Sequence, residues 1–243
     1  MKYYICVALL AALLAGCSSV PNSSSSSSES SSVAAAAPTT APTSTPVPAT
    51  ATPAPTASPT PVPEQSSIEV VDGITYVNGI LIANKTYSLP ADYAPGVNEE
   101  AKAAFEQMKQ AAAAEGLNIY ISSAFRSYEY QTKIYNNYVA RDGQQQADTY
   151  SARPGHSEHQ TGLAFDLNSI DDSFANTPES DWVAQHAHEY GFIIRYPADK
   201  ESVTGFKYEP WHLRYLGVDT ATKVYESGLC LEEYLDITSI YPQ

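Results

Sequence analysis

Two short stretches of this 243-residue chain contain side chains that could bind and activate a metal ion. The first holds His159 and Asp166, seven residues apart across Gly162, and the second holds His212, three residues after Glu209. Two imidazoles and one carboxylate suit Zn²⁺, and three protein ligands leave a position for water, as in catalytic zinc sites. A nearby glutamate that is not a ligand can accept the proton of that water. The residues therefore predict a hydrolase with one zinc ion per chain, although such spacings alone are often incidental.

Three helices are expected around these stretches, each with a recognisable start. Asn98, Ser127 and Thr177 are side chains that favour helix N-caps, and Pro178 fits the first helical position after Thr177. Glycine follows the first and third of these segments and favours their ends. The expected helices cover about residues 99–115, 128–140 and 178–190.

Strand signals alternate with these helices. Asn78-Gly79 between two apolar runs predicts a hairpin with a type I′ turn. Asp166 and His212 fall within other expected strands, so a turn at Gly162 would let His159 approach them. This mixture predicts an α+β fold in which an antiparallel sheet carries the metal site. The expected strands cover residues 74–77, 80–83, 119–121, 163–167, 192–194 and 211–216.

Four motifs, in order along the chain, resemble those of the VanY-type D-alanyl-D-alanine carboxypeptidases. These are zinc peptidases related to VanX-type dipeptidases and, by fold, to lysostaphin-like enzymes. The resemblance spans about residues 95–217 and implies a Hedgehog/DD-peptidase-like fold, with a small antiparallel sheet flanked by helices and the zinc site on the sheet. The motifs lie at residues 123–131, 153–166, 189–192 and 209–215.

The resemblance also implies roles for individual residues. Three residues would bind the zinc and a fourth would be the general base, namely His159, Asp166, His212 and Glu209. Arg126 would contact the substrate and the oxyanion, because its planar fork of donors suits a carboxylate or a developing negative charge. Gln131 and Ser157 match positions near the bound peptide terminus. Without the family pattern, Arg126 would rather be expected to neutralise surplus acids, and Glu158 is expected to face solvent or to contact a metal ligand.

The implied activity is removal of the terminal D-Ala from peptidoglycan stem peptides. An L,D-carboxypeptidase acting on tetrapeptide stems would use the same ligands, and an endopeptidase is a less favoured variant. A non-catalytic wall-binding lipoprotein would keep the zinc and lose the base, so the presence of Glu209 favours an enzyme.

The N-terminus predicts where the protein acts. Residues 1–17 carry the cation Lys2 near their start, continue with an apolar core too short to span a bilayer, and end in Leu-Ala-Gly-Cys, which resembles the lipobox of bacterial lipoproteins. Lipidation of Cys17 would anchor the chain to the bacterial cell membrane on its outer side. An ordinary secretory signal with an incidental cysteine is the alternative, and it is also extracytoplasmic.

The rest of the chain divides into a tether and one domain. Residues 18–67 are rich in Ser, Thr, Pro and Ala, a composition that predicts a disordered tether. Residues 68–243 are expected to form the catalytic domain and to be monomeric. The formal net charge of −14 disfavours nucleic-acid partners. Cys6 would leave with the signal peptide and Cys17 would be lipidated. Cys230 would then be the one remaining thiol, so no intramolecular disulfide is expected.

Overall fold

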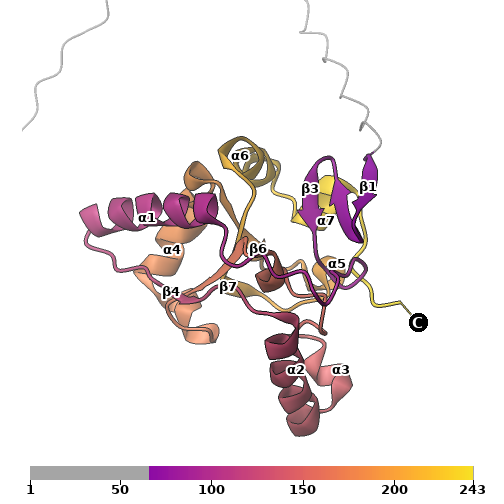
Figure 1. Cartoon of the computed structure of the whole chain (residues 1–243). Helices are drawn as coiled ribbons and strands as arrows, with labels where there is room; N and C mark the ends of the chain where they lie inside the picture. The colour runs from indigo at the N-terminus through magenta and orange to yellow at the C-terminus, as the bar shows by residue number, and fades with distance from the viewer. Residues whose placement is uncertain (1–65, 243) are drawn as a thin grey trace, which may run out of the picture. The chain divides into compact units, whose positions relative to one another are not determined.

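The computed structural model describes residues 66–242 (Figure 1). The predicted signal peptide, the lipidation site at Cys17 and nearly all of the predicted tether lie outside these residues. Within residues 66–242, no helix combines the length and apolar character needed to cross a bilayer. Helices and two small antiparallel sheets make up this part of the chain, so the α+β prediction is confirmed.

The larger sheet has four antiparallel strands in the order β4-β5-β7-β6. Its two central strands are β5 (Ala164–Leu167) and β7 (Glu209–Tyr215), flanked by β4 (Ile121–Ser123) and β6 (Phe192–Tyr196). Successive side chains of a strand point to opposite faces. Phe165 and Leu213 therefore enter the main core, while Asp166 and His212 face the other side.

Helices α1 (Glu99–Ala114) and α4 (Pro178–His186) cover the core side of this sheet (Figure 1). The predicted caps are present, because the side chains of Asn98 and Thr177 accept hydrogen bonds from the first turns of these helices. A 3₁₀ turn (Ala187–Tyr190) ends at Gly191 and leads into β6. Large apolar residues fill the space between sheet and helices, among them Phe105, Met108, Phe165, Trp182, Phe192, Trp211 and Leu213.

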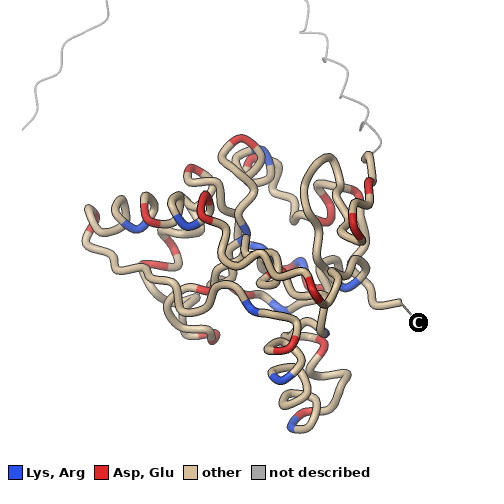
Figure 2. Tube along the Cα trace, in the orientation of Figure 1, with Lys and Arg blue, Asp and Glu red and all other residues tan. Residues whose placement is uncertain are grey.

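Helix α2 (Tyr128–Asp142) starts at the predicted cap Ser127 and lies beside the short helix α3 (Gln144–Ala147) (Figure 1). A 3₁₀ turn (Glu158–Thr161) precedes β5, and another (Asp172–Asn176) precedes α4. Acidic and basic positions are mixed along α1 and α2 and do not form a basic surface there (Figure 2).

The smaller sheet joins β1 (Ile68–Val71), β2 (Ile74–Val77) and β3 (Ile80–Ile82). The predicted hairpin is confirmed: Asn78 and Gly79 have φ angles of 51° and 78°, as a type I′ turn requires. Helices α6 (Val218–Ser227) and α7 (Leu231–Leu235) share a second apolar cluster with this sheet, and a short helix, α5 (Glu201–Thr204), follows β6.

Apart from β2, the predicted strands differ from the structure by one or two residues at their ends, and one overlaps its prediction at a single residue. The strand expected at residues 119–121 begins only at Ile121. Asn168 adopts a φ of 46°, and its side-chain oxygen accepts a hydrogen bond from the backbone N–H of Tyr120 while its side-chain amide donates to the carbonyl of Asn118. The Asn168 side chain thus pairs two backbone groups that a regular strand would pair through its ladder.

Candidate active site

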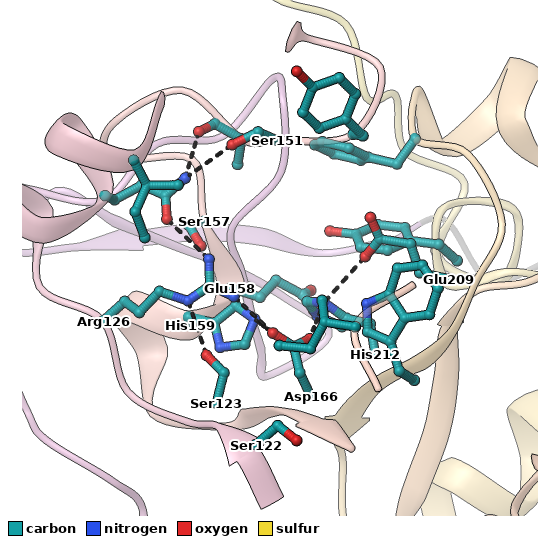
Figure 3. A pocket seen from close by; sticks show the side chains of 18 of the residues that line it. Ser122, Ser123, Arg126, Ser151, Ser157, Glu158, His159, Asp166, Glu209 and His212 are labelled. Atoms are coloured by element: carbon teal, nitrogen blue, oxygen red, sulfur yellow. Dashed lines mark hydrogen bonds and ion pairs between the residues drawn. The ribbon is translucent and has the colours of Figure 1, made fainter. Parts of the chain in front are cut away.

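The two central strands bring Asp166 and His212 directly opposite each other. His159 lies in the 3₁₀ turn before β5, and Gly162 ends that turn with a φ of 72°. A Cβ atom at Gly162 would overlap the carbonyl oxygen of Gly96, so glycine is required where the chain turns from His159 into the strand. The structure therefore brings together the three residues that the sequence analysis selected, with ligand atoms within 4.8 Å of one another (Figure 3).

Hydrogen bonding orients the first imidazole for metal binding. The Nδ1 atom of His159 lies 2.7 Å from the carbonyl oxygen of Ala124, which can only accept, so Nδ1 is the donor and Nε2 keeps its lone pair. That Nε2 atom lies 3.1 Å from Oδ2 of Asp166, and Nδ1 of His212 lies 3.3 Å from Oδ1 of Asp166.

The buried donor atoms fit a cation. His159, Asp166 and His212 are each at most 5% exposed, and Nε2 of His159 and Oδ1 of Asp166 have no hydrogen-bond partner within the described residues. Unpaired buried polar atoms are unfavourable, and a metal ion would satisfy these two. The mixture of imidazole and carboxylate is one that zinc accepts.

The protonation states favour the same ligand set. Burial, assisted by the charge of Arg126, lowers the pKa of His159 to about 4, so this imidazole is neutral at neutral pH. Burial lowers the pKa of His212, but the nearby carboxylates of Asp166, Glu158 and Glu209 outweigh it and raise the pKa above its ordinary value. Without a metal, His212 would hold a proton among three carboxylates, and a divalent cation would release it.

Glu209 lies at the start of β7 and is 7% exposed. Its Oε2 atom is 3.5 Å from Nδ1 of His212, and its carboxylate lines the same cavity as the metal-ligand residues. Burial raises the pKa of Glu209, and the charge of Asp166 adds to that rise, while His212 acts in the opposite direction. A raised pKa makes a carboxylate a stronger base, which suits a group that must accept a proton and return it.

Arg126 follows β4 and points its guanidinium group toward the metal-ligand residues (Figure 3). Its Nη2 atom donates to Oδ2 of Asp166 at 2.8 Å, Nη1 donates to Oε1 of Gln131 at 3.2 Å, and Nε donates to Oγ of Ser123 at 3.1 Å. These three contacts fix the plane of the fork. The guanidinium group of Arg126 therefore holds Asp166 in place and also lies where it can contact an anionic substrate.

The cavity around these groups measures about 350 Å³. Gln131 and Ser157 line it, as the sequence analysis expected of residues near the peptide terminus. Gln131 is held by Ala152, whose carbonyl oxygen accepts from Nε2 at 2.7 Å. Ser151, which no sequence motif pointed to, also lines the cavity and lies 3.4 Å from the same Nε2 atom.

Glu158 is not exposed to solvent, which corrects one of the two expectations for this residue. It is 1% exposed, and its Oε1 atom accepts hydrogen bonds from Nε of Arg195 at 2.7 Å and Nη1 of Arg214 at 2.9 Å. Burial raises the pKa of Glu158, but the charges of Arg195 and Arg214 outweigh it, so the carboxylate is ionised. An arginine within each of two apolar strands was the only sequence signal for this pairing.

Comparisons with known proteins agree with this geometry. A family model described as VanY, D-alanyl-D-alanine carboxypeptidase, matches residues 95–218. The D-alanyl-D-alanine carboxypeptidase of Enterococcus faecalis is 32% identical over 211 residues, which are 79% of this chain and 78% of that protein.

Two solved structures are similar in fold and sequence. The LdcB LD-carboxypeptidase is 44% identical with a TM-score of 0.68, covering 74% of this chain and all of its own. A vancomycin-resistance D,D-pentapeptidase, VanY, crystallised as an E175A mutant with Zn(II), is 35% identical with a TM-score of 0.57, covering 63% of this chain and 97% of its own. Related folds therefore occur in carboxypeptidases of both specificities.

Proposed function

Because the chain belongs to the VanY family of D-alanyl-D-alanine carboxypeptidases, we propose that it removes the C-terminal D-Ala from peptidoglycan stem peptides with the help of one zinc ion. Family membership makes the chain a peptidase, and the pentapeptide stem with its D-Ala-D-Ala bond is the substrate that the family name favours. The observation that carries the proposal is the buried site of three candidate ligands, with Glu209, which is not one of them, beside it.

We assign the metal to His159, Asp166 and His212, where zinc would polarise the scissile carbonyl group and lower the pKa of a water molecule. Glu209 would accept the proton of the attacking water and deliver it to the leaving amine, since its carboxylate lies beside His212 and opens into the cavity. Arg126 would pair with the terminal carboxylate of the peptide or with the developing oxyanion.

Gln131 and Ser157 would contact the peptide near its carboxylate end. Gln131 lies between the guanidinium group of Arg126 and the backbone at Ala152, so its amide is held in one orientation. Ser157 is 4% exposed at the cavity wall, directly before the residues that lead into His159.

An L,D-carboxypeptidase acting on tetrapeptide stems is the second candidate. The observation that favours it is the 44% identity to LdcB over the whole length of that chain, against 35% for the D,D-pentapeptidase. Both activities release D-Ala with the same ligands and base, so they differ only in the residue that precedes the cleaved bond.

We also propose that the enzyme acts outside the cytoplasmic membrane as a lipid-anchored monomer. The Leu-Ala-Gly-Cys sequence ending at Cys17 supports lipidation, and the Ser/Thr/Pro/Ala-rich residues 18–67 support a tether long enough to reach the cell wall. Metabolic labelling with a fatty-acid analogue tests the anchor: label that persists in a Cys17→Ser variant would contradict it.

Parallel digestion of pentapeptide and tetrapeptide stems tests the enzymatic proposal. Mass spectrometry should detect loss of one alanine from at least one stem, abolished by a chelator and restored by zinc. Loss from the pentapeptide alone supports the D,D specificity, and loss from the tetrapeptide alone supports the L,D specificity. A zinc-loaded protein that cleaves neither stem would overturn the proposal in favour of a non-catalytic wall-binding protein.

A further inference from the structure

Four buried charged side chains form a cluster on the Nε2 side of the candidate metal ligand His212, away from Asp166 and Glu209. They comprise two carboxylates and two guanidinium groups, each at most 1% exposed, namely Glu158, Arg195, Arg214 and Glu232. Both nitrogens at the end of Arg195 donate to the carboxylate of Glu232, and Nε of Arg195 donates to Glu158. The two positive and two negative charges balance, so this buried cluster needs no further counter-ion.

The cluster meets the candidate metal site at one point. Nδ1 of His212 lies on the side of Asp166 and Glu209, at 3.3 Å and 3.5 Å from their oxygens. Nε2 of the same ring lies on the opposite side, 3.6 Å from Oε2 of Glu158. Within the described residues, neither this Nε2 atom nor this Oε2 atom has a hydrogen-bond partner. At 3.6 Å, each of these two unpaired atoms is within reach of the other.

Glu158 has little freedom to move away from His212. Its other oxygen, Oε1, accepts from Arg195 and Arg214. Arg214 is fixed in turn, because its Nη2 donates to the carbonyl oxygen of Leu81 at 2.6 Å and its Nε donates to that of Tyr215 at 3.1 Å. A carboxylate restrained at one oxygen presents its second oxygen in a defined direction, here toward the imidazole.

We propose that Glu158 is a positioning residue that holds the His212 ring with Nε2–H toward the buried cluster and the Nδ1 lone pair toward the metal. This rests on the proposed function only in that His212 is taken as a ligand. A carboxylate that accepts the second N–H of a ligand histidine fixes its tautomer and makes it a better donor. Glu158 therefore links metal binding to the arginines of strands β6 and β7.

The link extends beyond the part of the chain that the family model matches. Glu232 in helix α7 pairs with Arg195, and Leu81 in strand β3 accepts from Arg214, while the match covers residues 95–218. Asn84 also donates to Glu232 at 3.1 Å. The segments before and after the matched region thus restrain the carboxylate that contacts His212.

The test is zinc affinity, measured by competition with a chromogenic chelator and without any substrate. Glu158→Gln should weaken zinc binding by about 10- to 100-fold, because the amide cannot replace the ionised acceptor. Glu232→Gln is the matched control: it is equally buried and also pairs with Arg195, but it does not contact His212. Its zinc affinity should stay within about threefold of wild type even if the fold is less stable.

Equal zinc affinities for wild type and Glu158→Gln, or equal losses in both variants, would overturn the inference. If the Glu158 variant does not fold, nitrogen NMR of the zinc-loaded wild-type protein decides: the proton of His212 should be on Nε2, and a proton on Nδ1 would refute the assignment. Zinc affinity and NMR are measured without peptide, so they do not depend on the activity. An enzyme that releases no D-Ala would count against the proposed function and not against the role of Glu158.

Discussion

Two groups of buried charges lie on opposite sides of His212, and they differ in how their polar atoms are satisfied. In the metal-side group, Nε2 of His159 and Oδ1 of Asp166 lack partners within residues 66–242. In the cluster behind the ring, both arginines are bonded to carboxylate or carbonyl oxygens. Burial alone therefore does not identify a functional site. The difference is that the unpaired atoms of the metal-side group belong to candidate ligands. In the cluster every charged group bonds to an opposite charge, and of its four side chains only Glu158 keeps an unpaired oxygen, Oε2, within residues 66–242.

Glu209→Gln tests the metal side of this comparison and should have the largest effect. Loss of the proton acceptor should reduce kcat for D-Ala release by about 10²- to 10⁴-fold. Zinc affinity and the free energy of unfolding should change little, because the amide preserves the shape of a side chain that is not one of the three candidate ligands.

Glu226→Gln, an exposed substitution of the same kind on helix α6, is the control and should retain wild-type kcat. Release of D-Ala from the better stem peptide, measured under zinc saturation, gives the comparison. A Glu209→Gln enzyme with kcat near that of the control would show that another group accepts the proton.

Arg195→Met tests the closed cluster. It leaves Glu232 without its two-pronged partner and Glu158 with one arginine, so the free energy of unfolding should fall by about 3–5 kcal/mol. The measurement is denaturant unfolding with a chelator present, which removes any contribution of bound metal.

Arg141→Met is the control for that substitution. Arg141 pairs with Asp142 on the exposed end of helix α2, and its side chain is 64% accessible, so the free energy of unfolding should change far less than in Arg195→Met. If both arginine variants lose the same small amount, the buried cluster does not stabilise the fold as its pairing indicates.

Local signals explain how much of the fold could be predicted from sequence. The cap at Asn98 and the Asn78-Gly79 turn act through adjacent backbone, and both were identified correctly. Strand β1 and helices α6 and α7 were not predicted. Strand β1 and helix α7 are short, and in α6 and α7 apolar residues such as Val224 and Leu231 gain their burial from partners distant in the chain.

The same distinction holds for the candidate site. Ordered motifs selected His159, Asp166 and His212, and the structure brings them together, while their roles remain proposals. Glu158 was left open between solvent and a ligand contact because its partners come from far along the chain: Arg195 is 37 residues away. Contacts of that kind depend on the packed sheet, which sequence spacing does not specify.

Arg126→Lys tests whether catalysis requires the planar guanidinium group at this position or only its positive charge. Lysine keeps the charge but cannot contact Ser123, Gln131 and Asp166 together as the planar group does. We expect kcat/KM to fall by about 10²-fold, with zinc affinity changed much less. A lysine variant with wild-type kcat/KM would show that charge alone is sufficient at this position.

The smallest effect expected concerns pH, and it compares one glutamate from each group. Glu209 has a raised pKa, mainly because of burial, whereas the charges of Arg195 and Arg214 overcome burial and lower the pKa of Glu158 below its ordinary 4.5. As pH falls, Glu209 is therefore protonated first, above pH 4.5, and can no longer accept a proton. Under zinc saturation, kcat/KM should then fall by about tenfold per pH unit.

Stability should depend on the other glutamate: protonation of Glu209 should leave the fold intact, and protonation of Glu158 should destabilise it. The ionised form of Glu209 is disfavoured in the folded state, so its protonation does not destabilise the fold. The stabilisation from Glu158 is fully present above its unfolded pKa of 4.5 and is lost only as pH falls below that value. Between the pKa of Glu209 and pH 4.5, activity should therefore decline while the urea midpoint, measured with a chelator, does not. A midpoint that falls together with kcat/KM across this interval would mean that the two glutamates do not titrate separately, because the two charge groups would then be coupled through His212.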